Sequence, residues 1–202
     1  MSQNIFKIEN LTKAIDDLLK VTENPRHRAM MVNYRRHAML EVAGRWQEIL
    51  APDMTVRHPV YRIYENGQYL HLDGMEDVTN FYKSIAEEEA TVFGPIEEEV
   101  YLSDNGIAME SFFGGSQHGS VLINQGIEVD DPDAYYNVTR WMSSFWPYDE
   151  NNLLIGEHIY ENYGSRKITK VDPEHVITPE DARAYLNLLI DNDPEWVKRP
   201  IK

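Results

Sequence analysis

Residues 61–71 read Tyr61-Arg62-Ile63-Tyr64-Glu65-Asn66-Gly67-Gln68-Tyr69-Leu70-His71, and they predict a β-hairpin. Tyrosine and isoleucine favour strands, and Asn66-Gly67 supplies the positive φ angles of a two-residue turn. A further strand is expected just before the hairpin, over residues 54–58. Helical patterns stand on both sides of these strands, so the chain combines helices and strands in one fold.

Two helices are expected before the hairpin. Asn10 is a candidate N-cap for a short leading helix that ends at Asn24-Pro25. Residues 26–50 contain no proline and are followed by Ala51-Pro52-Asp53, which stops a helix. This run predicts the long helix of the domain.

Two more helices are expected after the hairpin. Apolar side chains recur at three and four residues over 75–88, which predicts a helix with one apolar face. Thr178-Pro179-Glu180-Asp181 combines an N-cap, a proline in the first turn and acidic residues near the helix dipole. A last helix is therefore predicted over 179–190.

Four strands are expected between these helices, at residues 96–102, 107–113, 135–146 and 153–160. The acidic piece 123–134 is interpreted as a surface loop rather than a lid over a pocket. The order of elements predicts an α+β fold, a cone-shaped barrel in which a curved mixed or antiparallel sheet wraps around the long helix, with extra helices at both ends.

Length and composition predict one domain with appendages. The chain has 202 residues and is 42% hydrophobic, enough for one sizeable core. We expect an N-terminal helical extension over 1–25, a cone domain over 26–165 and a C-terminal helical extension over 166–202.

The formal charge of −15 repels nucleic acid and anionic membranes, so neither is an expected partner. Cysteine is absent, the first 20 residues are interrupted by charges, and no apolar run reaches about 18 residues. A cytoplasmic protein is expected.

One motif points to proton transfer. Ser116-Gln117-His118-Gly119 closes an aromatic run, and His58 ends an earlier predicted strand. Imidazole has an unperturbed pKa of about 6.5, which suits a general base near neutral pH. We therefore expect the two rings to meet in an apolar hollow.

Five stretches together resemble a known superfamily: residues 46–53, His58-Pro59, residues 73–78, residues 116–119 and residues 156–162. Over residues 33–162 the chain resembles the SnoaL-like polyketide cyclases, scytalone dehydratase and ketosteroid isomerases of the nuclear-transport-factor-two-like (NTF2-like) superfamily. The resemblance implies the cone fold, a general acid or base at His118, and a pocket position at His58. Scytalone dehydratase also uses an aspartate on the long helix; here that face has Tyr34, His37 and Glu41.

The expected activity is that of a cofactor-free lyase or isomerase, of dehydratase or cyclase type, on a hydrophobic steroid-like or polyketide-like ring system. No metal-binding motif such as His-Glu-x-x-His occurs. The candidate catalytic residues are His118, His58, His37 and Tyr34. The candidate substrate-binding residues are Tyr61, Tyr64, Glu41, Phe113, Arg140, Trp141 and His158.

Alternatives stay open. The second hypothesis is a non-catalytic small-molecule-binding protein or partner subunit that uses the same hollow, since a fold does not prove an activity. A limonene-type epoxide hydrolase ranks lower, because Arg140 has no evident aspartate partners; a structural ion pair with Glu110 or Glu157 is expected for it instead. Large aromatic residues on an open sheet favour a homodimer.

Overall fold

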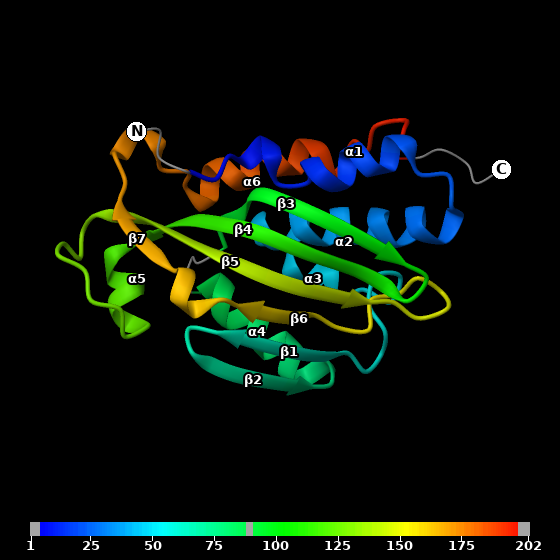
Figure 1. Cartoon of the computed structure of the whole chain (residues 1–202), viewed down its shortest axis with the longest axis horizontal. Helices are drawn as coiled ribbons and strands as arrows, with labels where there is room; N and C mark the ends of the chain where they lie inside the picture. Colours follow the sequence, from blue (N-terminus) through cyan, green and yellow to red (C-terminus); the bar gives the residue numbers. More distant parts are fainter. Residues whose placement is uncertain (1–4, 88–90, 198–202) are drawn as a thin grey trace.

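A curved sheet wraps around one long helix, as Figure 1 shows for the computed structural model, which describes residues 5–87 and 91–197. The sheet has seven strands in the order β2-β1-β6-β5-β4-β3, and β7 pairs with β5. Neighbouring strands are antiparallel except β1 and β6, which are parallel, so the sheet is mixed. The strands are β1 Val60–Glu65, β2 Gln68–Asp73, β3 Phe93–Ser103, β4 Gly106–His118, β5 Tyr135–Pro147, β6 His158–Glu161 and β7 Lys167–Lys170.

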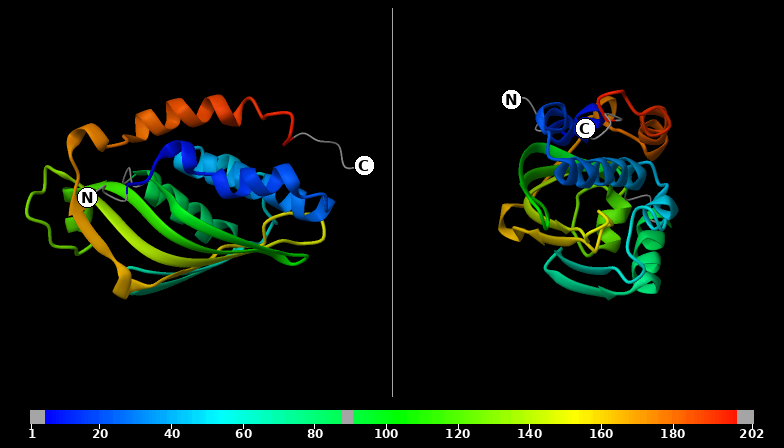
Figure 2. Two further views of the ribbon diagram at one scale, coloured as in Figure 1. Left: turned by 45° about the horizontal axis from the view of Figure 1, so that its top comes forward. Right: turned by 90° about the vertical axis from the view of Figure 1, so that its right-hand side faces the viewer.

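The long helix α2 lies inside the curve of the sheet, and two further helices cover its other side (Figure 2). Because α2 is enclosed on both sides, its buried residues point in nearly every direction. The α-helices are α1 Lys13–Val21, α2 Pro25–Val42, α3 Trp46–Ile49, α4 Met75–Glu87, α5 Gly119–Asn124 and α6 Pro179–Ile190. Short 3-10 turns lie at Ile8–Asn10, Tyr163–Ser165 and Pro173–His175.

The predicted α+β architecture is confirmed, including the hairpin. Asn66 and Gly67 adopt φ angles of 55° and 70°, as the two-residue turn requires. The capping box at the start of α6 is also present: Thr178 Oγ1 accepts from the Asp181 backbone N–H at 3.1 Å, and the Asp181 side chain accepts in return.

Helix boundaries differ from the prediction at three points. The leading helix begins at Lys13 with Thr12 as its N-cap position, while Asn10 ends a preceding 3-10 turn. The long helix ends at Val42 rather than at residue 50, because Gly44 has a φ of 71° that interrupts helical geometry before α3. The predicted end of the helix after the hairpin, residue 88, lies outside the described residues, as do 1–4 and 198–202 of the expected extensions.

Strand boundaries also differ. Residues 54–58 form no strand, since only Thr55 makes an isolated bridge, to Leu154. The strand predicted over 153–160 is confined to β6. In contrast, β4 runs on to His118, because it pairs with β5 along its whole length. β7 and α5 were not predicted; α5 occupies the start of the expected 123–134 loop.

The two faces of the sheet have different surroundings. Successive strand residues point to opposite sides, so Arg140, Met142 and Ser144 of β5 face inward while Trp141 and Phe145 face outward. Within the part of the chain described, no helix is both long and apolar enough to cross a lipid bilayer.

Candidate functional site

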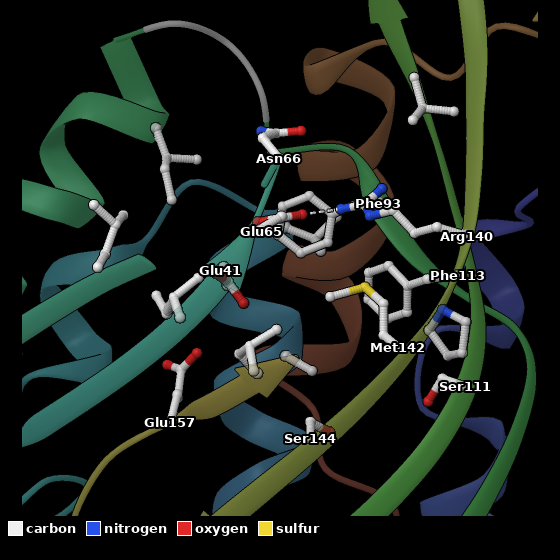
Figure 3. A pocket seen from close by; sticks show the side chains of 18 of the residues that line it. Glu41, Glu65, Asn66, Phe93, Ser111, Phe113, Arg140, Met142, Ser144 and Glu157 are labelled. Atoms are coloured by element: carbon white, nitrogen blue, oxygen red, sulfur yellow. Dashed lines mark hydrogen bonds and ion pairs between the residues drawn. The ribbon is translucent and has the colours of Figure 1, made fainter. Parts of the chain in front are cut away.

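A cavity of about 470 Å³ lies between α2 and the inner face of the sheet. This volume is within the range of small-molecule sites. Its walls combine apolar with polar side chains, and charged side chains project into it from different elements (Figure 3). The apolar lining includes Val42, Ile63, Leu70, Phe81, Ile85, Phe93, Phe113, Val138, Met142, Trp146 and Ile159.

One end of the cavity is built around Glu157. This carboxylate is only 4% exposed, and the Tyr82 hydroxyl donates a hydrogen bond to its Oε1. The Nε2 of His37 lies 3.1 Å from the same oxygen, and Tyr61 and Tyr82 share a hydroxyl contact of 3.2 Å. Since Tyr82 gives its proton to Glu157, Nε2 of His37 is assigned as a donor. The network fixes Glu157 from behind.

Backbone pairing sets the position of Glu157. Its carbonyl accepts from the Arg62 N–H at 2.8 Å, at the start of the parallel pairing of β1 with β6. Gly156 precedes it where a Cβ would come within 1.8 Å of the Val60 carbonyl oxygen, so only glycine allows this approach. The strand alternation then turns the Glu157 side chain inward, toward the cavity.

Glu41 reaches the same cavity from α2, one turn after His37. Burial raises the pKa of Glu41 well above its ordinary value, and the negative charges of Glu157 and Glu65 raise it further. Glu41 therefore keeps its proton near neutral pH. Tyr34, two turns earlier on α2, also lines the cavity, and burial raises the pKa of its phenol, so it stays a hydrogen-bond donor.

A third carboxyl, Glu98 of β3, lines the cavity beside Ser111 of β4. The Ser111 hydroxyl donates to Glu98 Oε1 at 3.0 Å. Burial raises the pKa of Glu98 to about 7, and the hydrogen bond from Ser111 opposes this rise only in part. This carboxyl therefore changes charge in the physiological range.

Arg140 belongs to a separate, balanced group of charges. It pairs with Glu65, and its Nε lies 3.7 Å from Glu161. Arg166 also binds Glu161, at 2.5 Å. The expected partner of Arg140 was wrong: Glu110 faces outward from β4, and Glu157 is bound by Tyr82.

Of the residues predicted for the site, Tyr34, Glu41, Phe113 and Arg140 line the cavity. His37 and Tyr61 are fully buried and lie behind its wall, in the network that holds Glu157.

The structure does not bring His58 and His118 together. The His58 side chain is 70% exposed and pairs with Asp73 at 2.8 Å, in the turn before β1. His118 Nδ1 contacts the Ser120 hydroxyl at 2.7 Å, and its ring packs on Tyr135. At this end of β4 it is Gln117 that lines the cavity, because alternation turns His118 away. The expectation that both rings face one hollow is thus corrected, and a catalytic role for either stays a prediction.

Three predicted substrate contacts lie on the outer face of the sheet. Tyr64 and Trp141 are 41% and 40% exposed there. His158 Nε2 lies 3.1 Å from an Arg62 nitrogen on the same face, where burial and then the Arg62 charge lower its pKa. The sequence left open which face of the last strand points inward, and it is the face of Glu157 and Ile159. Substrate contact by these three residues stays a prediction that their position does not favour.

Sequence reasoning missed Glu98, Glu65 and Tyr82 and did not select Glu157. A signal was present for Glu98, since in the strand segment Glu97-Glu98-Glu99 alternation must turn the middle residue away from its neighbours. Among the described residues, no group of three or more histidine, aspartate or glutamate side chains is placed to hold a metal ion.

Comparisons with known proteins identify the fold. Neither a protein-family model nor a curated protein matches the sequence. Among solved structures, an NTF2-like protein from Anabaena variabilis has a TM-score of 0.50 at 13% identity, covering 72% of this chain and 96% of that one. A structure from Jannaschia described as a SnoaL-like polyketide cyclase has a TM-score of 0.48 at 12% identity, covering 70% and 90%. A phenazine biosynthesis-related protein from Pseudomonas aeruginosa has 0.43 at 11%, covering 74% and 96%.

The mixed curved sheet around a long helix defines the class as an α+β cone. The likeness to the Anabaena variabilis structure makes this cone the NTF2-like fold. The resemblance noted in the sequence is confirmed at the level of the fold.

Proposed function

We propose that this chain is a cofactor-free lyase or isomerase, of dehydratase or cyclase type, that moves protons on a hydrophobic polycyclic molecule held in the cavity. The single observation behind the proposal is that Glu157 and Glu41, whose pKa is raised well above its ordinary value, face one cavity. Two neighbouring carboxyls, one of which holds its proton, can serve as an acid and a base. The acid and base roles thus move from His118 and His58 to these carboxyls.

The chemistry follows from the protonation states. Glu157 removes a proton from a carbon next to a carbonyl, and Glu41 gives its proton to a hydroxyl on the next carbon. The hydroxyl leaves as water, the electron pair of the C–H bond forms a C=C bond, and each carboxyl exchanges its charge state. In an isomerisation, the proton returns to a different carbon of the same molecule.

Tyr34 suits the role of donor to the carbonyl oxygen that gains charge, because its phenol keeps its proton and lines the cavity. His37 and Tyr82 act as positioning residues, since they hold Glu157 from behind the wall. The aromatic and aliphatic lining favours a flat steroid-like or polyketide-like ring system, and desolvation there strengthens the polar contacts.

The test is proton exchange in deuterated buffer with polycyclic enones and β-hydroxy ketones, followed by mass spectrometry. Wild-type protein is expected to catalyse exchange or dehydration, and Glu157→Gln or Glu41→Gln to lower the rate by about 10²–10⁴-fold. Glu110→Gln, on the exposed outer face of β4, is the matched control and should keep the wild-type rate.

Two results would contradict the assignment. Ligand binding without exchange for every compound would favour the alternative, a non-catalytic binding protein of the same fold. If His118→Ala loses activity and Glu157→Gln keeps it, the catalytic role returns to the His118 imidazole.

A second candidate is the limonene-type epoxide hydrolase. It gains support from the pairing of Arg140 with two carboxylates, Glu65 and Glu161, where the sequence offered no aspartates. Glu65 borders the cavity and is the member of this group able to activate water for attack on an epoxide. Incubation with styrene oxide in ¹⁸O-labelled water should then give labelled diol, and its absence would remove this candidate.

A further inference from the structure

Positive and negative groups are unevenly distributed along the cavity. Two arginines, Arg140 and Arg166, lie in its wall. Arg140 pairs with Glu65 and Glu161, and Arg166 pairs with Glu161, so two cations balance two anions. Glu98 lies outside this group. In the strand register it pairs with Ser111, Ser111 pairs with Met142, and Met142 pairs with Glu161. Arg140 is on β5, two strand spacings or roughly 10 Å across the sheet from β3, and among the described residues neither arginine forms an ion pair with Glu98.

Glu98 therefore faces the cavity without a cation. Its one hydrogen-bond partner is the neutral Ser111 hydroxyl, and within residues 5–87 and 91–197 no basic side chain forms an ion pair with it. The facing titratable group on α2 is Tyr34, which is also unable to supply positive charge. The ionisable groups of α1, which also packs against β3, are paired elsewhere: Lys13 and Lys20 with Asp17, and Asp16 with Arg35. On α2, Arg28 binds the Leu19 carbonyl, and Glu9 lies in the exposed turn before α1.

Glu157 and Glu98 are two polar anchors, carboxyl groups in the cavity wall that a ligand can bind. Ser111, which holds Glu98, lies across the cavity from Glu157 (Figure 3). Met142 and Ser144 of β5 line the wall on the way from Ser111 to Glu157, and Phe113 lies beyond Ser111, toward Arg140 (Figure 3). A ligand filling the cavity thus meets a carboxyl at either side and a mixed surface that contains apolar side chains between them.

We propose that the ligand is a hydrophobic molecule with a protonated amine, which pairs with Glu98 while the apolar skeleton fills the cavity and its reacting part faces Glu157. This inference rests on the proposed function and names its substrate class. A half-buried carboxylate without a cation is unfavourable, and an ammonium group supplies the missing charge. A ligand carboxylate in the same place would add a like charge, so anionic molecules are selected against.

A pH signature follows from this pairing. Free Glu98, with a pKa of about 7, is largely protonated at pH 6 and largely ionised at pH 8. An ammonium ion favours the ionised form, so its binding lowers the pKa of Glu98 and releases a proton. The affinity for an amine therefore rises between pH 6 and pH 8, and at pH 7 about half a proton is released for each amine bound.

The experiment uses three probes with one skeleton: 2-(2-naphthyl)ethylamine, 2-(2-naphthyl)ethanol and 2-naphthylacetate. Isothermal titration of the full chain at pH 6 and pH 8, in two buffers of different ionisation enthalpy, gives both affinity and proton release. At pH 8 the amine is expected to bind at least about tenfold more tightly than the alcohol, and the carboxylate most weakly. At pH 6 the preference for the amine should shrink.

Glu98→Gln keeps the acceptor for Ser111 and removes only the charge. It is expected to abolish the amine preference and the proton release while leaving the affinity for the alcohol unchanged. Glu97→Gln, its exposed neighbour on the outer face of β3, is the matched control and should retain both.

The outcomes separate this inference from the proposed function. If the alcohol binds but the amine has no advantage at pH 8, or if the advantage survives in Glu98→Gln, the amine assignment is overturned and the cavity stays a small-molecule site. Failure of all three probes to bind would overturn both.

Discussion

Glu98→Gln should make the protein more stable at alkaline pH. The cavity wall around Glu98 raises its pKa from 4.5 to about 7, and the first cause is burial. At 1.36 kcal/mol for each pKa unit, this rise corresponds to about 3 kcal/mol of free energy of unfolding.

The sign follows from the direction of the change. Folding favours the protonated form of Glu98, so its stabilising effect is fully present below pH 4.5 and is lost as the pH rises through about 7. Above that pH, the native state holds an ionised carboxylate that the unfolded chain would solvate better. Glutamine has no such charge, so the variant should gain about 3 kcal/mol over wild type at pH 8 and close to nothing at pH 4.5.

Urea unfolding followed by tryptophan fluorescence at pH 4.5, 6 and 8 measures the difference directly. The exposed Glu97→Gln serves as the control, with a pH profile parallel to that of wild type. If Glu98→Gln and wild type keep the same difference in unfolding free energy at all three pH values, the reasoning about burial is refuted.

Three further outcomes are expected. Tyr82→Phe removes the donor to buried Glu157 and should cost about 1–3 kcal/mol in urea unfolding; an unchanged midpoint would show that the hydrogen bond contributes little. Arg140→Leu leaves its carboxylate partners without that cation and should cost about 3–5 kcal/mol, and a neutral result would mean that the group is solvated. The exposed aromatic residues on the outer sheet face favour a homodimer, so light scattering should give twice the chain mass of 23.5 kDa. Trp141→Glu should reduce the measured mass to that of one chain, and Glu110→Gln is the control. A monomeric wild-type protein would remove the prediction.

The fold was predictable because its decisive signals are local. The Asn66-Gly67 turn and the Thr178 N-cap each act within a few residues, and each forms as expected, whereas Asn24-Pro25, predicted to end the leading helix, also starts the long one. The break after α2 had a local signal as well, since Gly44 stands where a helix C-terminus accepts a positive φ. The apolar run beyond it concealed that break. Strand β7 had no local signal, because its few residues form a strand only by pairing with β5, which is distant in the sequence.

The site was less predictable, because it depends on which face of each strand points inward. Alternation alone groups Gln117 apart from His118, and Glu157 apart from His158, without saying which member of each pair meets α2. The curvature and register of the sheet decide this, and they arise from pairings between strands far apart in the sequence. Charged residues on α2 were easier, since Glu41 follows His37 by one helical turn.

Infrared difference spectroscopy of the free protein at pH 9 tests most directly whether a protonated carboxyl lies beside Glu157. Glu98, with a pKa of about 7, is ionised at that pH, whereas burial and then neighbouring negative charge raise the pKa of Glu41 well above its ordinary value. We predict a carbonyl band of a protonated carboxylic acid in wild type that disappears in Glu41→Gln and persists in Glu98→Gln. A wild-type spectrum at pH 9 without this band would contradict the assignment of Glu41 as the acid.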